Sequence, residues 1–155
     1  MFKLTATALF VASVLVGTHA APAAIDNRSP VETFETLVKR TNHCYDSSFE
    51  NRWRASAPLV NDCRILASNI AGDGDWTQST ASGQRQIASF GTCHFGVEGA
   101  ETLLVSYRVG NQDVIDLIND SINRFQQDGR VAARGVMPCD QITPGTVRIL
   151  WGIYE

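Results

Sequence analysis

The sequence predicts an α+β domain in which two amphipathic helices pack on a mostly antiparallel sheet of about five strands, stapled by disulfide bonds. Two segments carry apolar residues at helical spacing, and several others alternate apolar and polar residues as strands do. The chain also has 4 cysteines, an even number that favours disulfide pairing. Short turns rich in Gly, Pro and Asp separate the segments, so neighbouring strands are expected to pair antiparallel.

The clearest element is a helix expected at 111–127. Its apolar or small residues recur every three or four positions and are Val114, Leu117, Ile118, Ser121, Ile122 and Phe125. The polar residues between them are expected to face water and are Asp113, Asp116, Asn119, Asp120 and Asn123. Asn111 is the expected N-cap, because its side-chain oxygen can accept a hydrogen bond from a first-turn amide. Asp128-Gly129 is expected to end the helix.

A second helix is expected to begin at Ser56-Ala57-Pro58, since serine is a good cap and proline is favoured in the first turn. Its buried stripe is expected to be Leu59, Cys63, Leu66, Ala67 and Ile70. The polar turn at 71–75 is expected to stop this helix.

The remaining segments predict five or six short strands. They lie at 47–50, 76–83, 84–97 (two alternating runs), 102–109, 130–137 and 147–153. In the last of these, Val147, Ile149, Trp151 and Ile153 share one face.

The N-terminal part has the features of an exported chain. A short basic start precedes the apolar run Leu4–Val16, and small residues lead to Ala20, so residues 1–20 are expected to be a signal peptide. Residues 21–40 are expected to be a propeptide or a flexible arm ending at the dibasic pair Lys39-Arg40. The folded domain is then 41–155, secreted and extracellular. No later run is long enough to span a bilayer, so stable membrane insertion is not expected.

All four cysteines follow the dibasic pair; they are Cys44, Cys63, Cys93 and Cys139. A zinc site is the alternative to two disulfides, but the chain has no C-x-x-C pair, and its histidines His43 and His94 each adjoin a cysteine instead of standing at ligand spacing. We expect no metal site.

The phase of the cysteines indicates a pairing. Cys63 lies on the core stripe of its helix, and Cys93 is in phase with the apolar residues of its strand, which favours Cys63–Cys93 together with Cys44–Cys139. The pairing Cys44–Cys93 with Cys63–Cys139 remains open as the alternative.

No pattern in the sequence predicts a catalytic residue or a cofactor. There is no phosphate loop, G-x-S-x-G or H-E-x-x-H motif, and every basic residue after Arg40 other than histidine is an arginine. No basic run with interleaved aromatic residues is present, so nucleic acid is not an expected partner. The carboxylates that could act as pairs are interpreted as turn residues (Asp73, Asp75) or a solvated helix face (Asp113, Asp116, Asp120). His94 is interpreted as a strand residue facing solvent.

Two surface features are candidates for modification or contact. Asn119-Asp120-Ser121 is a sequon on the polar side of a helix, so Asn119 is the glycosylation candidate. Trp53 stands between Arg52 and Arg54 in an expected loop, and we predict that it is exposed and available for contact.

Four blocks, at 56–63, 91–97, 129–135 and 151–154, together with the 111–127 helix, resemble the fungal extracellular-protein-two effector family, also called the necrosis-inducing factor domain. The resemblance runs from about Cys44 to Tyr154. It implies a secreted fungal effector, a non-enzymatic virulence protein that provokes necrosis in host plant tissue through an unknown host protein or cell-surface target. Of site residues it carries over only the four cysteines.

The resemblance also supports an alternative. Related domains occur beside chitinase-like modules in killer-toxin-like proteins, and the expected fold is similar to that of killer toxins. The alternative is therefore an antimicrobial or killer-toxin-like secreted protein aimed at competing microbes. A small hydrolase that uses the aspartates ranks last.

Overall fold

The computed structural model describes residues 40–72 and 74–155. The expected signal peptide, nearly all of the expected arm, and Asp73 lie outside these residues. The main sheet has five strands in the order β1-β6-β7-β4-β3, and each neighbouring pair is antiparallel. The strands are β1 (Glu50–Asn51), β3 (Arg85–Phe90), β4 (Cys93–Gly99), β6 (Ala133–Asp140) and β7 (Thr146–Tyr154).

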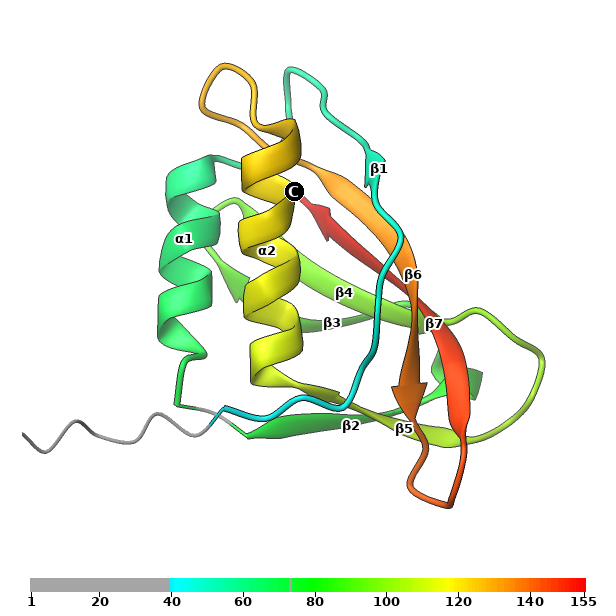
Figure 1. The fold of residues 1–155 in the computed structure, drawn as a ribbon. Helices are drawn as coiled ribbons and strands as arrows, with labels where there is room; N and C mark the ends of the chain where they lie inside the picture. The colour runs from blue at the N-terminus through cyan, green and yellow to red at the C-terminus, as the bar shows by residue number, and fades with distance from the viewer. Residues whose placement is uncertain (1–39, 73) are drawn as a thin grey trace, which may run out of the picture. The chain divides into compact units, whose positions relative to one another are not determined.

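Both helices, α1 (Val60–Asn69) and α2 (Asn111–Phe125), lie side by side over one face of this sheet (Figure 1). The predicted α+β class, with two helices on an antiparallel sheet, is confirmed. A smaller sheet of two antiparallel strands was not foreseen; it pairs β2 (Asp75–Ser79) with β5 (Ser106–Gly110). The 3-10 helix η1 (Thr80–Ser82) follows β2. In the described part of the chain, no helix is long and apolar enough to cross a membrane.

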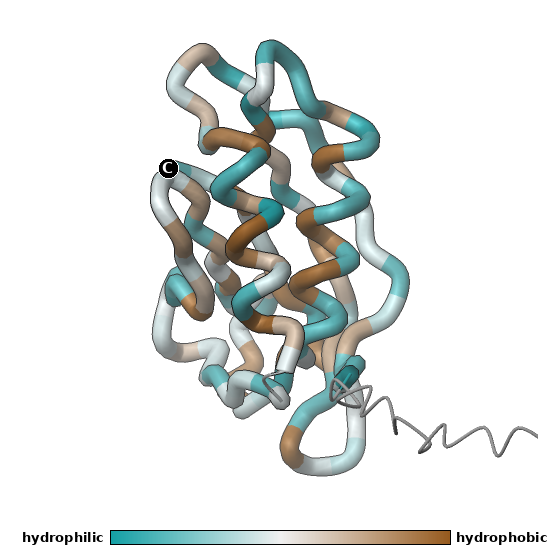
Figure 2. The backbone as a smooth tube through the Cα atoms, turned by 90° about the vertical axis from the view of Figure 1, so that its left-hand side faces the viewer, coloured by the Kyte–Doolittle hydropathy of each residue, from teal (hydrophilic) through white to brown (hydrophobic). Residues whose placement is uncertain are grey.

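Helix α2 buries most of the predicted stripe. Val114, Leu117, Ile118, Ser121 and Ile122 are buried, whereas Phe125 is only partly buried. Figure 2 shows apolar and polar residues alternating along both helices, as expected of elements with one apolar side. The ends of α2 differ from the prediction. The residue before the helix is Gly110, whereas Asn111 is its first residue and is 0% exposed. The side chain of Asn111 therefore lies inside the protein, where its Nδ2 donates to the Ile70 carbonyl.

The prediction for the end of α2 was two residues too long. The helix ends at Phe125 because Gln126 adopts extended backbone angles. Asp128 and Gly129 both have positive φ, 51° and 71°, and form a tight turn after the helix. Gln127 and Arg130 close this turn through two backbone hydrogen bonds, each N–H donating to the other residue's carbonyl.

Helix α1 begins at Val60, so Ser56 is not its N-cap. The residue before the helix is Leu59, whose backbone N–H donates to Thr92 Oγ1 at 2.9 Å. The prediction that Leu59 is part of the core was wrong, because Leu59 is 39% exposed. The next residue, Val60, is buried instead. The later stripe residues Cys63, Leu66, Ala67 and Ile70 are buried as predicted.

The core lies between the helices and the main sheet. The alternation predicted for the last strand is confirmed, since Val147, Ile149, Trp151 and Ile153 are buried on β7. The indole of Trp151 stacks on the Phe95 ring at a centroid distance of 6.0 Å, and its Nε1 donates to Ser47 Oγ.

Two disulfide bonds cross-link this core, and no described cysteine is free. Cys63–Cys93 joins α1 to β4, and Cys44–Cys139 joins the N-terminal segment to β6. This is the first of the two pairings considered from the sequence. The bonds link residues 30 and 95 positions apart, and closing such loops stabilises the fold by about 3 to 5 kcal/mol each in the chain-entropy account.

Candidate binding surface

The face of the main sheet that carries no helix is hollowed at its centre. One row of paired residues crosses four strands there: Arg134 on β6, Gly152 on β7, Gly96 on β4 and Gln86 on β3. Paired residues in a sheet point to the same face. The two adjacent glycines therefore contribute no side chain of their own to the strip between Arg134 and Gln86.

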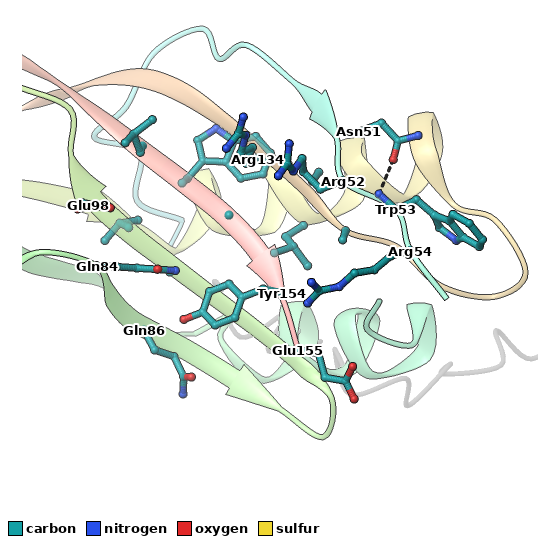
Figure 3. Close-up of a pocket in the computed structure, with 18 residues that line it drawn as sticks. Asn51, Arg52, Trp53, Arg54, Gln84, Gln86, Glu98, Arg134, Tyr154 and Glu155 are labelled. Atoms are coloured by element: carbon teal, nitrogen blue, oxygen red, sulfur yellow. Dashed lines mark hydrogen bonds between the residues drawn. The ribbon is translucent and has the colours of Figure 1, made fainter. Parts of the chain in front are cut away.

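The rows on either side of the glycines carry larger side chains and act as walls. Leu150 pairs with Glu98 on one side, and Tyr154 pairs with His94 on the other. Residues two apart in a strand share a face, so these side chains stand beside the glycine strip. Leu150, Glu98 and Tyr154 line, together with the 51–54 segment, an open hollow of about 950 Å³, which we call the glycine trench (Figure 3).

The ring of Tyr154 folds over the trench floor. A Cβ atom placed on Gly96 would lie 2.9 Å from ring atom Cε1, so glycine is required for this position of the ring. Figure 3 shows the phenol directed toward Gln84. Burial raises the pKa of the Tyr154 hydroxyl, and a hydrogen bond from the Gln84 side chain partly offsets this effect.

One bank of the trench carries three arginines, Arg52, Arg54 and Arg134. Glu50 pairs with two of them, because its carboxylate accepts from Arg134 Nε and from Arg52 Nη1, both at 2.8 Å. These contacts, first with Arg134 and then with Arg52, lower the pKa of Glu50. Arg54 reaches from the same segment toward Tyr154 (Figure 3).

The prediction that Trp53 is exposed was wrong, whereas its role as a contact residue stays a prediction. The side chain is half-buried, and its Nε1 donates to the Gln127 carbonyl at 2.9 Å. Trp53 is one of the residues that line the trench, but its indole points away from Tyr154 (Figure 3). Trp53 therefore fixes the 51–54 segment against the turn after α2.

A second hollow, of about 570 Å³, lies between the N-terminal segment and α2 and is bordered by four aspartates, Asp46, Asp113, Asp116 and Asp120. The prediction that Asp113 faces water was wrong, since it is only 9% exposed. Its Oδ2 accepts backbone hydrogen bonds from His43 at 2.8 Å, Cys44 at 3.1 Å and Gly110 at 2.8 Å. Burial raises the pKa of Asp113, and these hydrogen bonds oppose that shift.

The other candidate acids and bases are also held in contacts within the domain. His43 Nε2 lies 2.9 Å from Asp75 Oδ2, and its Nδ1 lies 3.7 Å from Asp140 Oδ2. Asp116 accepts from the Gln112 side chain, and Asp120 pairs with Arg124 on the exposed side of α2. No group of three metal-binding side chains occurs in the described part of the chain.

His94 is half-buried, whereas the sequence predicted a solvent-facing residue. Its ring lies 5.8 Å from that of Tyr154, and its Nδ1 is buried with no hydrogen-bond partner among the described residues. Asn119 is exposed on α2, which leaves its glycosylation a prediction.

Comparison with known proteins gives a family and two relatives. The family model described as "Pathogen effector; putative necrosis-inducing factor" matches residues 43–139. The probable chitinase LysM18 of Penicillium expansum is 37% identical over 113 residues, or 72% of this chain and 8% of that protein. The secreted chitinase LysM12 of the same organism is 30% identical over 116 residues, or 71% of this chain and 7% of that protein.

The chain thus spans less than a tenth of the length of either relative. The family model, in contrast, covers well over half of the chain and includes all four cysteines. This is the family that the four sequence blocks and the 111–127 helix resemble, and the resemblance is confirmed. The protein belongs to the family of pathogen effectors described as necrosis-inducing factors.

Proposed function

We propose that this protein is a secreted fungal effector that acts on host plant tissue, in the host apoplast, without catalysing a reaction. It works by binding a host protein or a target on the host cell surface. The observation that carries the proposal is its membership of the pathogen effector family.

Two further observations support an extracellular site of action. Both disulfide bonds belong to the compact domain, and such bonds persist in oxidising compartments outside the cytosol. One relative is named as a secreted protein.

Several acidic and basic side chains are held in hydrogen bonds or ion pairs within the domain, which supports a binding role over a catalytic one. A general base needs an accessible lone pair near its substrate. The Asp113 carboxylate accepts from three backbone amides, and Asp62 accepts from the backbone and the hydroxyl of Thr92. His43 is held between two carboxylates. These side chains serve the fold, and the glycine trench offers a shaped surface instead.

Infiltration of purified secreted protein into leaves tests this function. We expect necrosis with the wild type and an equal response with Asp73→Asn, Asp75→Asn, Asp116→Asn and Asp120→Asn, because none of these carboxylates performs chemistry. The double variant Cys63→Ala/Cys93→Ala should lose the response with its fold. Loss of necrosis in a folded aspartate variant would instead indicate an enzyme.

The names of the two relatives favour a second candidate, an antimicrobial or killer-toxin-like protein aimed at competing microbes. Both are chitinases by name, and chitin is a polymer of N-acetylglucosamine found in fungal walls. The matched segment is a small part of each relative, so we propose that it is an accessory domain that contacts the microbial cell wall. Growth inhibition of fungi by the purified protein, without a plant response, is the expected result for this candidate.

A further inference from the structure

We propose that the glycine trench is a binding site for a short neutral oligosaccharide, and that its ligand class is oligomers of N-acetylglucosamine. The trench itself argues for a neutral oligosaccharide. The choice of N-acetylglucosamine rests on the second candidate function, the action at a microbial surface. The trench is not assigned a ligand by the family description or by the names of the relatives.

The shape of the trench is set by two missing side chains. Gly96 and Gly152 are direct neighbours across β4 and β7, and strands lie about 5 Å apart. The Tyr154 ring covers Gly96, so the open part of the floor is the strip about 5 Å wide over Gly152. Leu150 and Tyr154, on either side of Gly152, keep the strip narrow along the strand. A flat ring can lie in such a slot, whereas a helix or a folded protein surface would first meet the walls.

The lining chemistry suits a polyhydroxylated ring. Tyr154 offers an aromatic face on which the apolar face of a sugar can pack, together with a polar hydroxyl at its end. Gln84, Gln86 and Arg54 present planar side chains with several donors and acceptors at the rim. An N-acetyl group adds one amide donor, one carbonyl acceptor and a methyl group, which match an amide side chain and the exposed apolar side chain of Leu150.

The charges at the trench argue against a strongly anionic ligand. Arg52 and Arg134 already share the Glu50 carboxylate, and Glu98 lines the opposite side. Arg54 is the only lining arginine for which no salt bridge is found among the described residues. A polyanion would therefore have to displace Glu50 from its ion pairs with Arg52 and Arg134, and it would be repelled by Glu98. A neutral oligosaccharide meets neither obstacle.

Gly152 provides a way to fill the trench without disturbing the fold. A Cβ atom added there would meet only Ala133 O at 3.8 Å and Arg134 Cβ at 3.9 Å, which are ordinary contacts. A β-branched residue is also favoured in a strand. Gly152→Val should consequently keep the melting temperature while its side chain occupies the floor. Gly96→Val would strike the Tyr154 ring and is unsuitable as a first test.

The experiment is calorimetric titration of the purified secreted protein with a hexamer of N-acetylglucosamine. Cellohexaose, which lacks the N-acetyl groups, and an oligogalacturonate, which is anionic, are the comparison ligands. We expect the N-acetylglucosamine hexamer to bind most tightly. Gly152→Val and Tyr154→Ala should each weaken binding about tenfold or more, whereas Tyr154→Phe should keep most of it. Arg148→Ala is the matched control, because Arg148 lies on β7 outside the trench and contacts Glu101.

Four results would overturn the proposal. Three concern binding: absence of binding to any neutral oligosaccharide, unchanged affinity in a folded Gly152→Val protein, and preference for the oligogalacturonate. The fourth concerns self-association. A wild-type dimer that Gly152→Val dissociates would assign the trench to self-association instead. None of these results depends on necrosis, so failure of the trench proposal leaves the proposed effector function standing, and the reverse also holds.

Discussion

The Asp113 carboxylate accepts a hydrogen bond from the backbone N–H of His43, a residue 70 positions earlier in the chain, at 2.8 Å. The same oxygen binds the N–H of Cys44 and of Gly110. One side chain at the start of α2 therefore holds the N-terminal segment against the body of the domain. A negative charge is also favoured at this end of a helix, because the helix dipole is positive there.

Asp113→Asn should destabilise the protein by about 1.5–3 kcal/mol. The amide keeps one acceptor oxygen but loses the charge that strengthens three hydrogen bonds. Urea unfolding of the two proteins measures the difference. Asp116→Asn is the matched control on the same helix, and its exposed position limits the expected change to about 0.5 kcal/mol. Equal stabilities for the wild type and Asp113→Asn would show that the contacts contribute nothing.

Gly110→Ala should loosen the same segment by a steric route. A Cβ atom at residue 110 would overlap the Thr41 carbonyl, which is backbone and cannot rotate away. We expect a loss of about 1–3 kcal/mol in unfolding free energy. Hydrogen exchange at the amides of His43 and Cys44 should also become faster. Gly72→Ala is the control, because nothing lies within 4 Å of its added atom. Unchanged exchange in Gly110→Ala would contradict the model of a clamped segment.

Tyr107 should make the protein sensitive to alkaline pH. Its burial, with a smaller contribution from the charge of Glu98, raises the pKa of the hydroxyl from 10.0 to about 12. Between these values the unfolded chain releases the proton while the folded protein retains it, so stability falls as pH rises through this window. Melting temperatures recorded across it should drop for the wild type and drop less for Tyr107→Phe. A parallel decline in both proteins would assign the effect to other groups.

Trp53→Phe tests the role that the structure gives to the indole. The substitution removes the hydrogen bond to the Gln127 carbonyl but keeps an aromatic ring on the 51–54 segment. We expect a loss of about 0.5–1.5 kcal/mol in stability, the net value of one hydrogen bond. Plant response and oligosaccharide binding should stay at wild-type levels. A folded Trp53→Phe protein without activity would restore Trp53 as a contact residue.

The parts of the fold set by local pattern could be predicted from the sequence. The buried stripe of α2 and the alternation along β7 follow from periodicity alone. The same reasoning favoured the observed disulfide pairing, since Cys63 and Cys93 both fall on buried positions, but it left the alternative pairing open because Cys139 is buried as well. Leu59 was assigned to the core because it fits the helical period, but the helix starts one residue later.

The parts set by distant contacts could not be predicted. Asp113 and Asp116 both belong to the polar positions of the predicted helix. Asp113 is buried because the segment 41–44 packs on it, whereas Asp116 stays exposed. The glycine trench depends on the register that places Gly96 opposite Gly152. Nothing local to either glycine reveals that register. Alternation alone does place Gly152 and Tyr154 on the face opposite Trp151, and this was the available signal.

The Cys44–Cys139 bond closes a ring of chain that contains both helices and every strand from β1 to β5. A protease that cuts once inside this ring leaves two pieces that are still covalently joined. The exposed Leu103 and Leu104 stand in such a loop. The two pieces of a nicked molecule therefore stay close together and can keep the packing of the intact fold, which protects the domain against a single proteolytic cut.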